Sequence, residues 1–160
     1  MYKKNIKLSL FFLLLLLPLG CGFKVLNKSK INTFTIQEIR TGGDNRISQK
    51  IKNNLLSYTD RETQKNLIVY LNSKKSKTIK EKNIKNQITK YQIKLDIQVS
   101  IQFIGTNQNM KKMNFSASGD YPVANIHSIS LSNEKKLIDN LIENISTNIL
   151  DEIELKLNDI

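Results

Sequence analysis

The sequence predicts an α/β fold, a two-layer sandwich in which two helices pack on one face of a four-stranded mixed sheet. Two observations carry this prediction. Apolar and polar residues alternate strictly over residues 90–103, as in a long strand, and apolar residues keep helical spacing over residues 137–157. A second amphipathic helix and further strands precede them, so the expected order is β-α-β-β-β-α.

The first expected strand covers residues 33–40, with Phe34 and Ile36 on one face. Gly42 and Gly43 interrupt it, and Asp44 can cap a helix. The apolar positions of that helix recur at steps of four, four and three residues: Ile47, Ile51, Leu55 and Tyr58. Residues 67–71 are almost continuously apolar, which is typical of a buried central strand.

The long strand has one dry face, running from Tyr91 to Phe103, and one wet face, running from Lys90 to Gln102. Turn residues follow at 105–109. The dry face continues on a returning strand, with Met113, Phe115, Ala117 and Tyr121. Residues 90–121 are therefore predicted to form a hairpin.

After Pro122 a loop leads to Ser132 or Asn133, either of which can cap the final helix. The first strand and the first helix are expected to return to a parallel neighbour. A right-handed crossover of this kind places the first helix on the same face of the sheet as the last helix.

The N-terminus has the order of a bacterial lipoprotein signal. Lys3, Lys4 and Lys7 precede an apolar run over residues 8–17, and Pro18-Leu19-Gly20-Cys21 follows. The run is shorter than the ~20 residues that a transmembrane helix needs. Cys21 is the only cysteine, so it has no partner for an internal disulfide. We expect a signal peptide at residues 1–20, a tether at 21–32 and one domain at 33–160.

Lipid on Cys21 would anchor the mature chain to a membrane. Residue 22 is Gly and not the Asp that retains lipoproteins at the inner membrane of enteric bacteria, so the expected location is the periplasmic side of the outer membrane. Pro18 stands where such signals prefer Leu, which leaves an ordinary signal peptide as the alternative.

The chain is strongly basic, with a formal charge of +11. Three of the 25 basic residues and none of the 14 acidic ones precede Cys21, so the mature part keeps +8. This surplus favours an acidic partner. For an exported chain, phosphorylated lipid is a better match than nucleic acid, which we do not expect as a partner. The alternative is a codon bias toward A and T, which enriches lysine on any solvated surface.

Nothing in the sequence predicts catalysis. The single histidine, His127, is expected in a loop beside Ser128 without an orienting acid. No metal-ligand set and no cofactor motif are present. The carboxylates of the last helix, Glu134 among them, are explained by a solvated face. The chain is therefore predicted not to be an enzyme, and a hydrolase that uses His127 is the competing hypothesis.

A lysine cluster between the second and third strands is the best candidate for binding. Glu81 is its only acid. On a long hairpin these lysines would project from one end of the sheet and meet several phosphates, for which flexible lysines are suited. The alternative is a charged guard against edge pairing. The cluster consists of Lys74, Lys75, Lys77, Lys80, Lys82, Lys85 and Lys90.

These features together resemble the LPS-assembly lipoprotein family, LptE. The matching segments are Cys21-Gly22-Phe23, the early strand and helix, Lys90 to Leu95, Gly119 to Ala124, and the long final helix. The chain departs from the family in the displaced leucine before Cys21 and in its preference for lysine over arginine.

The resemblance implies a non-enzymatic subunit of the outer-membrane lipopolysaccharide translocon. Such a subunit plugs an LptD-type β-barrel, helps the barrel assemble and binds lipopolysaccharide. Neutral side chains on the wet face of the long strand suit a polar barrel lumen: Gln92, Gln98, Ser100 and Gln102. The lysine cluster could then engage the phosphates of lipid A. The competing function is a free-standing periplasmic structural or envelope-tethering lipoprotein without a transported ligand.

Overall fold

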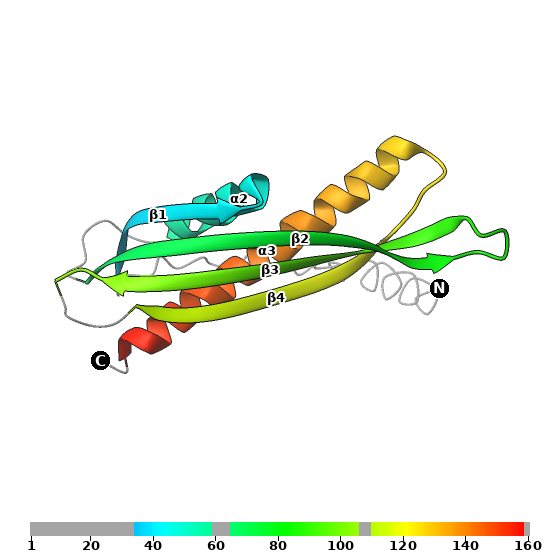
Figure 1. Ribbon diagram of the computed structural model, residues 1–160. Helices are drawn as coiled ribbons and strands as arrows, with labels where there is room; N and C mark the ends of the chain where they lie inside the picture. Colours follow the sequence, from blue (N-terminus) through cyan, green and yellow to red (C-terminus); the bar gives the residue numbers. More distant parts are fainter. Residues whose placement is uncertain (1–33, 59–64, 106–109, 159–160) are drawn as a thin grey trace, which may run out of the picture.

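Alternating burial along the strands separates the molecule into a sheet layer and a helix layer (Figure 1). The computed structural model describes residues 34–58, 65–105 and 110–158. Cys21, the signal peptide and the tether at 21–32 lie outside the described residues. The elements follow in the predicted order: β1 (Thr35–Gly43), α2 (Asn45–Tyr58), β2 (Asn66–Lys82), β3 (Ile88–Phe103), β4 (Lys111–Pro122) and α3 (His127–Asn158).

The four strands form one mixed sheet in the order β1-β2-β3-β4. β1 pairs with β2 in parallel, and the other two pairings are antiparallel. The predicted fold class and the predicted hairpin of residues 90–121 are therefore confirmed. β2 and β3 are the longest strands, with 17 and 16 residues, and together they extend beyond the helix layer at one end (Figure 1).

The core lies between the sheet and the two helices. Five alternate residues of β3, Ile93 to Ile101, are at most 1% exposed. They face apolar side chains of both helices, such as Leu55 and Ile149, which are fully buried. Burying a side chain of this size stabilises the fold by about 1.5 to 3 kcal/mol. The dry face that the alternation predicts is therefore the centre of the core.

Both helices cover the same face of the sheet, as the crossover argument predicts. Lys50 of α2 forms an ion pair with Asp139 of α3. The amide of Asn54 on α2 lies 3.4 Å from the Ser146 hydroxyl on α3. The predicted apolar stripe of α2 is buried throughout, and Asp44 caps the helix by accepting a hydrogen bond from the Ile47 backbone nitrogen at 3.2 Å. No helix in the described part of the chain is long and apolar enough to cross a membrane.

β2 continues far beyond the apolar run that predicts it. It pairs with β3 as far as Lys82, whereas the apolar run in the sequence ends at Leu71. From Lys74 onward its side chains are mostly exposed on both faces, so no alternation marks this part in the sequence. The backbone ladder with β3 holds it in place. The seven lysines therefore lie largely on strands and not in a loop between strands.

The sequence predicts the start of α3 too late along the chain. The helix begins at His127, before Ser132 and Asn133, so neither residue is its cap and His127 is not a loop residue. The first turns carry alternating serines without an apolar stripe, which hides them in the sequence. Ser130 stabilises them locally, because its hydroxyl lies 2.8 Å from the backbone nitrogen of Ala124 and 3.3 Å from the Ala124 carbonyl.

The corner between β1 and α2 packs tightly against β2. β1 runs on through Gly42 to Gly43, where the sequence predicts an interruption. Ser48 donates a hydrogen bond to the Gly42 carbonyl at 2.7 Å and lies 2.6 Å from the Ser73 hydroxyl. Both serines are buried. Gly43 adopts a φ of +77°, and a Cβ atom there would lie 2.0 Å from the Ser73 carbonyl oxygen.

Gly43→Ala is therefore expected to destabilise the fold by about 2 kcal/mol or more, because strain at positive φ adds to a clash with backbone. Chemical denaturation monitored by circular dichroism measures this loss. Gly105→Ala is the matched control. Its φ is +82°, but nothing lies within 4 Å of the added Cβ, so it should cost only about 1 to 2 kcal/mol. Equal losses of stability in Gly43→Ala and Gly105→Ala would contradict the tight packing of Gly43 against β2.

Candidate functional site

The structure divides the predicted lysine cluster between two faces of the sheet. Side chains alternate along β2, so Lys75 and Lys77 lie on the helix side and Lys74 lies on the helix-free side. Lys77 reaches Glu134 of α3. Lys80 reaches Asp120 on β4. The remaining three lysines lie toward the outer end of the β2–β3 hairpin: Lys82, Lys85 and Lys90.

Several of these lysines have acidic partners. The Lys77 ammonium lies 2.7 Å from Glu134, and the Lys90 ammonium lies 2.8 Å from Glu81. The hydrogen bond with Glu81 raises the pKa of Lys90 above its ordinary value. The Lys80 ammonium keeps only a 3.9 Å contact with Asp120. The pairs of Lys80 and Lys90 are exposed and contribute little to stability, so they leave these two side chains able to change partners.

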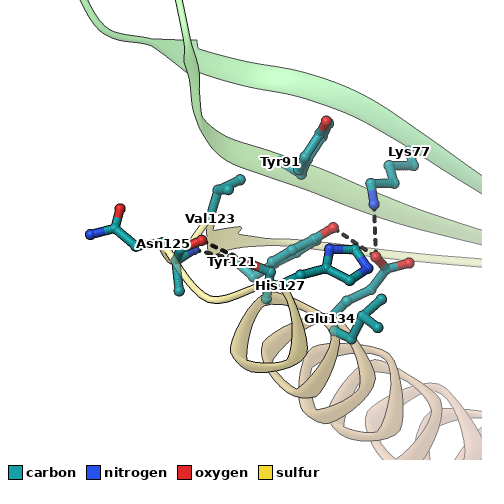
Figure 2. A pocket seen from close by; sticks show the side chains of 10 residues that line it. Lys77, Tyr91, Tyr121, Val123, Asn125, His127 and Glu134 are labelled. Carbon is teal, nitrogen blue, oxygen red and sulfur yellow. Dashed lines mark hydrogen bonds and ion pairs between the residues drawn. The ribbon is translucent and has the colours of Figure 1, made fainter.

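Lys77 belongs to a clasp between the sheet and α3, which we define as Lys77, Tyr91, Tyr121 and Glu134 (Figure 2). Glu134 accepts a hydrogen bond from the Lys77 ammonium and another from the Tyr121 hydroxyl, each at 2.7 Å. The ammonium also lies over both aromatic rings, at 4.3 Å from the centroid of Tyr91 and 5.3 Å from that of Tyr121. The rings themselves stack with centroids 5.8 Å apart.

Sequence reasoning missed the clasp, because it explains Glu134 by a solvated face. The Glu134 side chain is only 18% exposed. The signal lay in the aromatic positions 91 and 121, which face each other across the β3–β4 pair. Their proximity to position 134 depends on how α3 crosses the sheet, and no local pattern encodes that crossing.

Burial and pairing act in opposite directions on the clasp. Burial alone raises the pKa of Glu134, but hydrogen bonds from Lys77 and Tyr121 lower it below its ordinary value of 4.5. Burial alone lowers the pKa of Lys77, but the bond to Glu134 raises it above 10.5. Burial raises the pKa of Tyr121, so this phenol stays protonated and donates. At neutral pH the clasp therefore holds one carboxylate and one ammonium that neutralise each other.

A hollow of about 350 Å³ adjoins the clasp, where β4 ends and α3 begins (Figure 2). Val123, His127 and Leu131 line it together with the two tyrosines. Its charged groups, Lys77 and Glu134, are engaged with each other. The hollow therefore offers an apolar wall beside a satisfied ion pair.

A second hollow, of about 790 Å³, lies between the starts of α2 and α3. Three elements bring cations to it, although no single stretch of sequence predicts the group: Arg46, Lys50, Lys75 and Lys135. Acids also line it, and Lys50 is paired with Asp139. Lys75 is thus separated from the lysines of the hairpin end.

The helix-free face of the sheet is polar and shallow. A hollow of about 280 Å³ on this face is lined by Tyr70, Asn72, Gln98 and Ser100. Arg40 borders it and is held by two 2.9 Å hydrogen bonds to Glu38. The predicted wet face of β3 is confirmed, since Gln98 and Gln102 are exposed. Most side chains here are neutral donors and acceptors, which can hydrogen-bond either to water or to a polar protein surface.

Glu134→Gln tests the clasp. We expect a loss of about 1 kcal/mol at pH 7, because a charge-assisted hydrogen bond is replaced by a neutral one. The pKa of Glu134 is lowered in the folded chain, so its contribution is present above pH 4.5 and disappears as the pH falls through the folded value.

Urea denaturation at several pH values measures this dependence. The two chains should converge in stability as the pH falls below 4.5. If the difference in stability between the unaltered chain and Glu134→Gln is the same at pH 7 and in acid, the ion pair does not contribute as stated. Asp151→Asn, farther along the same helix at an exposed position, provides a control for general charge effects on α3.

Comparison with solved structures identifies proteins of the same fold. Rare lipoprotein B from Shewanella oneidensis matches with a TM-score of 0.55 and 7% identity, over 74% of this chain and 95% of that chain. A minor lipoprotein from Acinetobacter baumannii matches with a TM-score of 0.56 and 12% identity, over 79% of this chain and 94% of that chain. Lipoprotein B from Nitrosomonas europaea matches with a TM-score of 0.57 and 9% identity, over 82% of this chain and 90% of that chain.

No protein-family model matches the chain, and no curated protein matches it in sequence at a significant level. Identities of 7 to 12% establish a common fold and nothing finer. The chain thus has the fold of these bacterial lipoproteins.

Proposed function

We propose that this chain is a non-enzymatic lipoprotein of the outer membrane that is anchored through Cys21 and plugs an LptD-type β-barrel. In this role it assists assembly of the barrel and binds lipopolysaccharide during its insertion. The lipoprotein signal before Cys21 supports the anchor. The fold, shared with solved bacterial lipoproteins from three species, supports the assignment to this class of envelope protein.

The observation that carries the proposal is the helix-free face of the sheet. Both helices cover the opposite face, and no element in the described part of the chain covers the other broad face of the sheet (Figure 1). Its side chains near Gln98 are polar and mostly neutral. The interior of an outer-membrane barrel is polar as well, so a plug needs hydrogen-bonding side chains and no unpaired charge. The part of the face around Gln98 meets that requirement, because its side chains are mostly neutral and Arg40 is paired with Glu38.

The hairpin end supplies the groups for lipopolysaccharide. Lys82 ends β2, Lys85 lies in the turn between β2 and β3, and Lys80 is held only loosely by Asp120. Lysines present point charges that bind phosphate without demanding a fixed geometry. Lys77 is part of the clasp, and we assign it a structural role in place of the binding role that the sequence suggests.

A free-standing periplasmic structural or tethering lipoprotein is the second candidate. The same fold and the same anchor support it, and the polar face would then simply contact water. The two functions differ in one observable, which is whether a large outer-membrane barrel is recovered with the chain.

A tagged full-length chain, extracted in mild detergent from its own cells, is expected to co-purify with a large outer-membrane β-barrel. Gln98→Trp should reduce the recovered barrel at least severalfold, because a bulky ring is added at the centre of the proposed contact face. Mass spectrometry identifies the barrel and immunoblotting quantifies it.

Asn140→Trp is the matched control, since Asn140 is exposed on α3 and lies outside the helix-free face. It should leave recovery unchanged. If no barrel is recovered with the unaltered chain, the plug function is wrong and the free-standing lipoprotein replaces it. Equal loss in the two variants would show that another face carries the contact.

Lipopolysaccharide capture tests the hairpin end. Lys82→Ser combined with Lys85→Ser should weaken capture by immobilised lipopolysaccharide about five- to thirtyfold, because two exposed ion pairs between lysine and phosphate are lost and each contributes about 0.5 to 1 kcal/mol. The effect should shrink in high salt, since these charges are exposed.

Lys135→Ser combined with Lys136→Ser removes the same charge from α3 and serves as the control. Capture that falls equally in both double variants would indicate a response to net charge alone. Capture that falls only with the α3 variant would move the binding site to the hollow beside Lys75.

A further inference from the structure

β4 ends the sheet, and its outer edge pairs with no other described strand. Its pairing with β3 runs from Lys111 to Pro122 without a register shift. Figure 1 shows β4 as the outermost strand on the side away from β1. A regular edge of this length presents a row of backbone donors and acceptors that can pair with another strand.

The outer edge of the β2 extension carries features that discourage pairing with another strand, and the middle of β4 lacks them. β2 extends past the end of β1, which pairs with it only as far as Ser73. The extension carries several lysines, Lys74 among them, and its register with β3 shifts near Glu81. Charges and bulges of this kind discourage pairing with another chain. Between Met113 and Gly119, β4 has no charged residue, no proline and no bulge.

We propose that β4 pairs antiparallel with β4 of a second copy of this chain, around a two-fold axis at Ser116. The charges at the two ends of β4 favour a second copy of this chain as the partner. With Ser116 opposite itself, Lys112 of each copy faces Asp120 of the other on the helix-free side. Asp120 is available for this contact because its own partner, Lys80, lies 3.9 Å away.

The same register also matches side-chain sizes on the helix side. Phe115, which is partly buried, would face Ala117 of the other copy. Met113 would face Gly119, above which Leu137 is packed at 2.6 Å from the position of a Cβ atom. Between Met113 and Gly119, large side chains on the helix side therefore meet small ones, as antiparallel pairs in close-packed sheets require.

Neighbouring registers lack this match. A shift of the axis by one residue, to Phe115, places Lys112 opposite Ser118 and the two phenylalanines opposite each other. A shift to Ala117 places Lys112 opposite Pro122 and Asn114 opposite Asp120. Only the axis at Ser116 forms two opposite-charge pairs, so electrostatics selects one register among those that the backbone permits.

This pairing goes beyond the proposed function and does not depend on it. It joins two four-stranded sheets into one continuous sheet, with the helix-free faces of both copies on the same side. Such an arrangement is isologous, because the same surface of each copy contributes the contact.

Disulfide cross-linking tests the axis. Cys21→Ala removes the only native cysteine of the full chain, and Ser116→Cys then places one cysteine at the axis. In mild detergent with an oxidant, this variant should form a covalent dimer at least fivefold faster than Ser118→Cys in the same background. Residues 118 of the two copies would lie about 14 Å apart, at ~3.4 Å per residue, which no disulfide spans.

Charge reversal tests the register. Lys112→Asp alone and Asp120→Lys alone should each weaken the dimer about tenfold in sedimentation velocity, because each creates two like-charge pairs. The double variant Lys112→Asp with Asp120→Lys should restore association to within about threefold of the unaltered chain. Circular dichroism verifies that each variant is folded.

Equal cross-linking at positions 116 and 118 would overturn the proposed axis. A double variant as weak as the singles would overturn the register. A chain that stays monomeric up to about 100 μM would overturn pairing with a second copy, since even weak specific contacts populate a dimer at that concentration.

Discussion

The burial of one face of β3 is the interaction on which the rest of this structure depends. β3 is central, since β2 and β4 both pair with it, and its alternate side chains are almost completely removed from water. Because side chains alternate across a strand, a dry face on one side leaves a wet face on the other. The two helices must therefore share one side of the sheet, and among the described residues nothing covers the opposite side.

The long β2–β3 ladder starts from the same centre and extends beyond it. Where the helices end, β2 and β3 continue as a paired ribbon held mainly by backbone hydrogen bonds. The clasp around Glu134 ties the base of this ribbon to α3 through one ion pair and two aromatic rings. In physical terms it fixes where the covered sheet ends and the projecting hairpin begins. The lysines beyond the clasp therefore lie on a hairpin whose base is fixed to α3.

Much of the fold could be predicted from periodicity because burial imposes it locally. The alternation from Tyr91 to Phe103 indicates a half-buried strand, and the stripe of α2 indicates a half-buried helix. Prediction failed where a segment is exposed on all sides. The outer half of β2 and the first turns of α3, from His127, carry no apolar pattern, because neither buries one face. Their conformation is set by a neighbouring strand and by the local hydrogen bonds of Ser130.

The sequence by itself determined the class of the fold, the order of the elements and the identity of the dry face, since each of these rests on a repeat along the chain. It also predicts that Cys21 carries lipid. Only the tertiary structure decided which lysines share a surface, that Lys77 is bound to Glu134, and that β4 is an unguarded edge. These properties depend on how strands line up and how α3 crosses them, and such long-range geometry leaves no local signature.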